Sequence, residues 1–201
     1  MLEHRRHLTR AGCVAMAGIL LFLSGCGINN IPTQKQQVDA AWSQVLNEYQ
    51  RRTDLIPNLV ATVKGYAAHE ASVLEAVTEA RAKVTQTQIP SDILTNPQAF
   101  QSFERNQATL GGALSRLMVV TENYPNLKAD QNFLTLQAQL EGTENRIAVA
   151  RRDYILAVQQ YDTELTTIPG RWYRSLFYSG NQLIQNFTIS EQAQQAPQVK
   201  F

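Results

Sequence analysis

His69 and Glu70 are adjacent, as are the first two residues of a helical zinc-hydrolase motif. That motif needs a second histidine four residues after the first, so that both imidazoles face one metal ion. Position 73 is Val73, and His69 is the only histidine beyond the first ten residues. A carboxylate-bridged metal site would need Glu-x-x-His pairs on two helices. Gly111-Gly112 lacks the lysine and hydroxyl residue of a phosphate-binding loop. The sequence therefore predicts no catalytic residue, no metal and no cofactor, and we expect no enzyme.

Cys26 is the residue with the clearest predicted chemistry. It follows a basic start, an uncharged and mostly apolar run over 11–25, and the small residues Ser24 and Gly25. This order is typical of a secretory signal, and the run is shorter than the roughly 20 residues that cross a bilayer. Leu23-Ser24-Gly25-Cys26 resembles the bacterial lipobox, in which the cysteine thiol is lipidated after cleavage before it. An uncleaved signal anchor is the alternative, and it also leaves the chain on a membrane.

Removal of residues 1–25 changes the composition of the chain. Cys13 leaves with this segment, so Cys26 is the only remaining thiol and the folded part has no disulfide or cysteine metal cluster. Arg5, Arg6, Arg10 and the single acid Glu3 also leave; subtracting them from 18 basic and 17 acidic residues gives a net charge of about −1. Nucleic-acid binding is not expected without a basic excess.

The pattern of apolar residues predicts an all-α fold, an up-and-down antiparallel bundle of about four long helices. The first helix is expected over 33–52, with a break at 54–56 because Pro57 disfavours a helical residue before it. The second starts at Pro57, the third at Pro97 behind an Asn96 cap, and the fourth covers 129–167. The second helix has a coiled-coil spacing of 4 and 3 residues along the seam Ile56, Val60, Val63, Ala67, Glu70, Leu74, Val77, Arg81 and Val84.

Four charged residues fall on or beside these seams: Glu70 and Arg81 in the second helix, Glu144 and Arg146 in the fourth. Buried charges are costly unless they are paired, and paired ones can set helix register. We expect Glu70 and Arg81 to pair with polar residues of the fourth helix. In the alternative interpretation both side chains extend to water.

Residues 171–178, RWYRSLFY, combine four aromatic residues with two arginines. Such a segment either folds back to cap the end of the bundle or lies at a bilayer interface. The polar end of the chain, 190–201, is expected to be extended.

Several stretches together resemble the LemA family. They are VDAAWS at 38–43, RRTDLIPNLV at 51–60, VKGYA at 63–67, ENYPNLK at 122–128, LEGTENRIAVAR at 140–151 and APQVKF at 196–201. The resemblance implies an all-helical bundle held at the cell envelope by its N-terminus, and it implies no enzymatic activity. Many family members begin with a longer spanning helix, where this chain has a lipobox.

These observations predict a domain order of signal peptide (1–25), lipidated tether (26–33), helical bundle (34–170) and C-terminal segment (171–201). We expect a membrane-anchored lipoprotein with a structural or interaction role and with helix faces for unidentified envelope proteins or a second copy of itself. Gly27 after the lipobox favours the periplasmic face of the outer membrane in a Gram-negative host. The alternatives are an adaptor for a membrane protease in quality control and a lipid-binding, membrane-remodelling protein.

Overall fold

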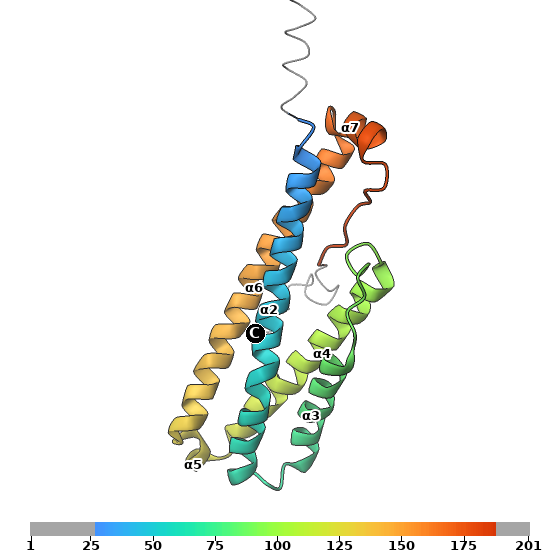
Figure 1. The fold of residues 1–201 in the computed structure, drawn as a ribbon. Coiled ribbons are helices and arrows are strands. Elements are labelled where there is room, and N and C mark those ends of the chain that lie inside the picture. Colours follow the sequence, from blue (N-terminus) through green and yellow to red (C-terminus); the bar gives the residue numbers. More distant parts are fainter. Residues whose placement is uncertain (1–26, 188–201) are drawn as a thin grey trace, which may run out of the picture.

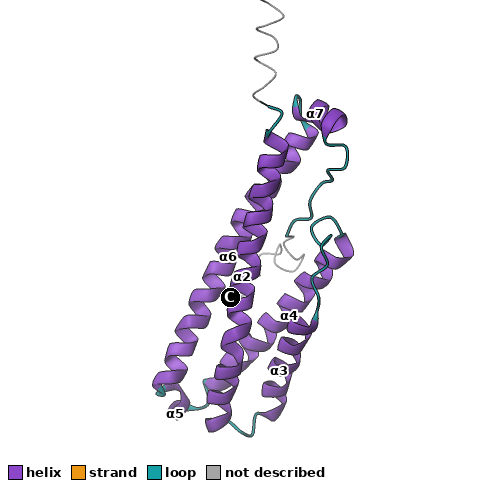
Figure 2. Ribbon diagram, in the orientation of Figure 1, coloured by secondary structure: helices purple, strands orange, loops and turns teal. Residues whose placement is uncertain are grey.

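A computed structural model describes residues 27–187, and this range consists of helices and loops (Figures 1 and 2). The helices are α2 (Asn30–Tyr66), α3 (Ala71–Gln86), α4 (Pro97–Thr121), α5 (Pro125–Lys128), α6 (Gln131–Thr166) and α7 (Gly170–Phe177). No residue between 27 and 187 is in a strand, which confirms the predicted all-α class. The predicted signal segment, Cys26 and the polar end at 190–201 lie outside the described residues.

The helices associate as two unequal pairs. The long helices α2 and α6 lie side by side along their length, and the shorter α3 and α4 pack mainly on each other, with α3 also against α2 (Figure 1). The short helix α5 connects α4 to α6 at the end of the molecule where α2 also ends. The predicted arrangement of four long helices is therefore not confirmed, because α3 has 16 residues against 37 in α2.

The predicted break before Pro57 is wrong, because α2 continues through it to Tyr66. A proline inside a helix has no N–H for the carbonyl four residues earlier, which here belongs to Thr53. Arg81 of α3 donates to that carbonyl instead, with Nε 3.2 Å from the oxygen. A side chain from the neighbouring helix therefore satisfies the acceptor that Pro57 leaves open. The chain turns at 67–70 instead, between α2 and α3.

The predicted starts of the third and fourth helices agree with the structure, whereas the second helix, α3, begins at Ala71 and not at Pro57. Asn96 caps α4, accepting at Oδ1 from the N–H of Ala99 at 3.1 Å, and Pro97 occupies the first helical position. Asp130 caps α6, accepting at Oδ1 from the N–H of Asn132 and of Phe133, both at 2.9 Å. The expected fourth helix over 129–167 therefore corresponds to α6.

The buried core of the described residues consists of two clusters arranged one after the other along the bundle. The aromatic cluster contains Ile31, Val38, Trp42, Val45, Tyr49, Ile93, Leu94, Phe100, Phe103, Ile147, Ala150, Tyr154, Val158, Tyr161, Leu165, Ile184 and Phe187. The aliphatic cluster contains Ile56, Leu59, Val63, Ala67, Leu74, Val77, Ala80, Leu110, Ala113, Leu114, Leu117, Leu127, Phe133 and Leu140. Each cluster draws on α2, α4 and α6, so the three helices pass from one cluster to the other.

The start of α2 and helix α7 lie at the same end of the molecule (Figure 1). The first helix begins earlier than the predicted residue 33, since α2 starts at Asn30 and Ile31 is fully buried. After α7 the chain runs back along the bundle, where the N–H of Gln185 donates to the carbonyl of Leu94 at 2.7 Å. The side chain of Phe187 then enters the aromatic cluster.

Candidate functional site

A layer of polar side chains separates the two core clusters. On α2, Arg52 and Thr53 lie between Tyr49 of the aromatic cluster and Ile56 of the aliphatic cluster. Gln107 holds the corresponding position on α4 and Thr143 on α6. All four residues are buried, so the core changes from aromatic to aliphatic across a polar boundary that all three helices share.

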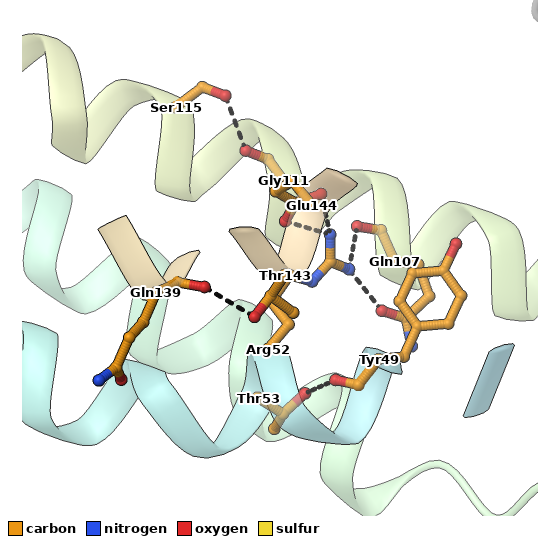
Figure 3. Close-up of polar contacts among 9 residues, drawn as sticks. All are labelled: Tyr49, Arg52, Thr53, Gln107, Gly111, Ser115, Gln139, Thr143 and Glu144. Atoms are coloured by element: carbon orange, nitrogen blue, oxygen red, sulfur yellow. Dashed lines mark hydrogen bonds and ion pairs between the residues drawn. The ribbon is translucent and has the colours of Figure 1, made fainter. Parts of the chain in front are cut away.

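Arg52 is the centre of this layer (Figure 3). Its side chain is only 4% exposed. The Nη1 atom donates to Oε1 of Glu144 on α6 at 3.1 Å, and Nη2 donates to Oε1 of Gln107 on α4 at 2.6 Å and to the Gln107 carbonyl at 3.2 Å. The guanidinium also lies 5.0 Å from the centre of the Tyr49 ring, within range of a cation–π interaction. One buried cation thus joins three helices at a fixed register.

A second ion pair lies beside this layer and joins α2 to α6. Arg146 Nε donates to Oε2 of the nearly buried Glu48 at 3.0 Å. Arg146 Nη2 also donates to the Thr143 hydroxyl at 2.9 Å, and that hydroxyl donates to the carbonyl of Gln139 at 2.7 Å. Both ion pairs connect an α2 residue to an α6 residue, with the arginine on α2 in one and on α6 in the other.

The four charged residues singled out in the sequence have different partners. Glu144 and Arg146 belong to the two ion pairs with α2. Glu70 accepts a hydrogen bond from the Tyr124 hydroxyl at 2.9 Å, which raises the pKa of that phenol, and Arg81 donates to the Thr53 carbonyl. The structure therefore does not bring Glu70 and Arg81 to the fourth predicted helix.

Sequence reasoning missed Arg52, Gln107 as its acceptor, and Glu48. The break expected before Pro57 places Arg52 at the end of the first predicted helix, so its buried position in the core could not be inferred. A continuous helix gives the spacing of 4 and 3 residues through Val38, Trp42, Val45, Tyr49, Arg52, Ile56, Leu59 and Val63. This seam places the charge of Arg52 in the core.

The aromatic side of the layer borders a cleft of about 350 Å³ between α2, α3 and α4. Its lining includes Tyr49, Thr53, Phe103 and Gln107, and no acidic, basic or histidine side chain is among its lining residues. Burial raises the pKa of Tyr49, so this phenol stays protonated at neutral pH. The cleft offers hydroxyl and amide groups for hydrogen bonding.

Residues 27–187 contain no cluster of side chains suited to bind a metal ion. No group of three or more His, Cys, Asp or Glu side chains in this range is placed to hold a metal ion. His69 lies exposed in the turn between α2 and α3. No helix in the described range is both long enough and apolar enough to span a bilayer.

Comparison with known proteins identifies the family. The model of the LemA family matches residues 41–201. Two curated relatives, the magnetosome proteins MamQ 1 and MamQ 2 of Paramagnetospirillum magneticum (strain ATCC 700264 / AMB-1), are each 26% identical over 175 residues. The match covers 79% of this chain and 64% of each relative, so the chain spans less than two thirds of the length of these relatives. Because the family match extends over most of the sequence, the chain belongs to the LemA family.

Proposed function

We infer that this protein is a non-enzymatic helical scaffold of the cell envelope, held on a membrane by a lipid on Cys26. The observation that carries the scaffold role is the polar layer. Its central cation, Arg52, is almost fully buried and engaged by Glu144 and Gln107. A cation committed to internal acceptors positions helices, whereas a catalytic cation must reach a substrate.

The register that this layer sets suits a long, stiff element. The 37 residues of α2 correspond to about 55 Å at 1.5 Å per residue, and α6 packs beside α2. A bundle of this length, tethered at one end, would present helix faces to envelope proteins or to a second copy of the chain. The relatives are named for a cell structure, the magnetosome, and an assembly role for this chain is consistent with that.

The lipobox resemblance supports the anchor, and in a Gram-negative host we propose the periplasmic face of the outer membrane. Intact-mass analysis of the protein from its native membranes tests this. The expected N-terminus is Cys26 carrying a diacylglyceryl group, and a Cys26→Ser variant should lose that mass. A free Cys26 thiol, or a chain that retains residues 1–25, would contradict lipid anchoring.

The scaffold role is tested separately by crosslinking in intact cells. A lysine-reactive crosslinker of short span should link the chain to itself or to defined envelope proteins. The Arg52→Ala variant should change this pattern because helix register is lost, while Arg51→Ala, the loss of the neighbouring exposed arginine, should leave it unchanged. A chain that remains entirely monomeric and uncrosslinked at native abundance would argue against a scaffold.

A further inference from the structure

Helix α7 exposes three large apolar side chains to solvent. Trp172 is 59% exposed, Leu176 is 73% exposed and Phe177 is 62% exposed. Trp172 and Leu176 are one helical turn apart and therefore share a face. Ile168, just before the helix, and Leu183, just after it, are also exposed. Exposed apolar clusters of this kind mark surfaces that bind a protein or a membrane.

Other side chains of α7 pack on the bundle. The helix is therefore held in place while Trp172, Leu176 and Phe177 remain exposed. Tyr173 and Tyr178 pack against the aromatic cluster. Arg174 Nε donates to the carbonyl of Asn181 at 3.1 Å, which ties the helix to the returning chain. Gly170 lies so close to α6 that a Cβ atom there would collide with the carbonyl oxygen of Glu164.

The position of α7 indicates what covers its exposed face. Gly27 lies against α7, since a Cβ atom at position 27 would be 2.9 Å from Cε2 of Tyr173. Gly27 directly follows Cys26, and consecutive Cα atoms are about 3.8 Å apart. A lipid on Cys26 would therefore tether the chain to a bilayer at the end of the bundle where α7 lies.

The charge of this region also suits a phospholipid surface. Between Leu165 and Phe187 the sequence contains no acidic residue, and its two charged residues are Arg171 and Arg174. Arg171 is exposed. Tryptophan and arginine together are typical of segments in the interface between headgroups and acyl chains, where the ring stays partly hydrated and the cation faces anionic lipid.

We propose that α7 is a lipid-facing helix that lies in the membrane interface beside the anchor, with Trp172, Leu176 and Phe177 inserted below the headgroups of an anionic bilayer. The orientation rests on the proposed lipid at Cys26. Two contacts at one end, anchor and helix, make the bundle stand away from the surface with α5 at its distal end. With a single flexible anchor, the bundle could tilt freely relative to the bilayer.

The chain has two tryptophans, which makes the test direct. Full-length protein from its membranes is reconstituted into phosphatidylcholine–phosphatidylglycerol vesicles whose acyl chains carry bromine near the headgroup, and tryptophan emission is recorded. The wild type is compared with Trp172→Phe, a surface change that leaves Trp42, 7% exposed, in the core. The emission assigned to Trp172 should be roughly twofold lower than in vesicles without bromine, because an interfacial helix sits about 5–10 Å into the headgroup and acyl boundary. The emission of Trp42 should not change.

A double variant, Leu176→Ser with Phe177→Ser, removes the exposed face and should reduce the quenching of Trp172. Val119→Ser is the matched control, since Val119 is 70% exposed in the last turn of α4, at the opposite end of the molecule. Helix content by circular dichroism verifies that each variant folds.

The outcomes separate this inference from the anchor. Protein that floats with the vesicles while Trp172 is no more quenched than Trp42 overturns the role of α7 and leaves the anchor intact. Quenching of Trp172 in protein whose mass shows no lipid sustains α7 and contradicts the anchor. A third outcome is that Trp172 emission indicates a buried ring in a dimer without lipid, and that the double serine variant is monomeric with a solvent-exposed Trp172. This result would assign the face to dimerisation and overturn the membrane contact.

Discussion

The two clusters on either side of the polar layer share three helices but differ in side chains and in the segments that close them. Trp42 of the aromatic cluster packs against Phe100, Phe103, Tyr154 and Phe187, with ring centres 5.2–6.2 Å apart. The aliphatic cluster is built mainly from leucine, valine and alanine and is covered by α3 and α5. Flat rings fill a space that is closed by α7, loop segments and the returning tail, while helix-on-helix packing suits branched aliphatic side chains.

The two halves are closed by different parts of the chain. The aromatic half lies next to the start of α2 and α7, and Phe187, from beyond α7, is part of its core. The guanidinium of Arg151 lies 4.3 Å from the centre of the Phe187 ring and covers it. The aliphatic half contains the turn at 67–70 and the connection through α5. The end predicted to face the membrane is thus closed by the tail, and the distal end is closed by short local connections.

The largest effect is expected when the boundary between the halves loses its counter-ion. Glu144→Ala leaves the charge of Arg52 buried with only Gln107 as acceptor, and it should lower the free energy of unfolding by about 2 kcal/mol. Glu141→Ala is the control, because Glu141 is exposed on the same helix and accepts from Gln137 of that helix. Urea unfolding measures both variants. Equal stability of the two would mean that the polar layer does not hold the helices in register.

A smaller effect is expected in the aliphatic half, where Pro57 and Arg81 depend on each other. Arg81→Met should cost about 1 kcal/mol, because it leaves the Thr53 carbonyl without its donor. In a Pro57→Ala background the same change should cost less, since position 57 then supplies a backbone N–H to that carbonyl. Urea unfolding of the four proteins gives the coupling energy. Lys83→Met on the same helix is the control, and additivity of the two changes would refute the explanation for the continuous α2.

Pro57 also shows where sequence reasoning succeeds and where it does not. Helix starts at Asn96 and Asp130 depend on neighbouring residues, so local patterns could predict them. Whether a helix survives an internal proline depends on a donor from elsewhere, here Arg81, and the sequence around position 57 contains no sign of it. The error at Pro57 then concealed Arg52, although the heptad spacing through it was present.

The C-terminal segment illustrates the same limit. Its aromatic composition suggested two alternatives, a cap or a membrane contact, and the structure divides the residues between two faces. Tyr173 and Tyr178 pack on the core, while Trp172 and Leu176 are exposed. The insertion of Phe187 could not be predicted, because the hydrogen bond from Gln185 to Leu94 and the Arg151 contact join residues far apart in the sequence.

The smallest expected effect is a pH dependence of stability, caused by the ionisation of Asp162 in the aromatic half. This carboxylate accepts from the N–H of Ile184 at 3.2 Å and so helps to fix the returning tail. Burial raises its pKa, and this outweighs the lowering by the Ile184 N–H and by Arg174. Because the folded-state pKa lies above the unfolded one, stability is greatest below the unfolded pKa and declines as pH rises through the folded value.

Asp162→Asn keeps an acceptor for Ile184 but cannot ionise, so at pH 7 its melting temperature should exceed that of the wild type by about 2 °C or less. The difference should close as pH falls to about 3, where the wild-type carboxyl is also neutral. Asp153→Asn, an exposed change on the same helix, controls for net charge. Thermal unfolding across this pH range measures both. If Asp162→Asn is instead less stable at pH 7, the ionised carboxylate strengthens the Ile184 contact by more than its burial costs, and the aromatic half is closed by a charge-assisted hydrogen bond.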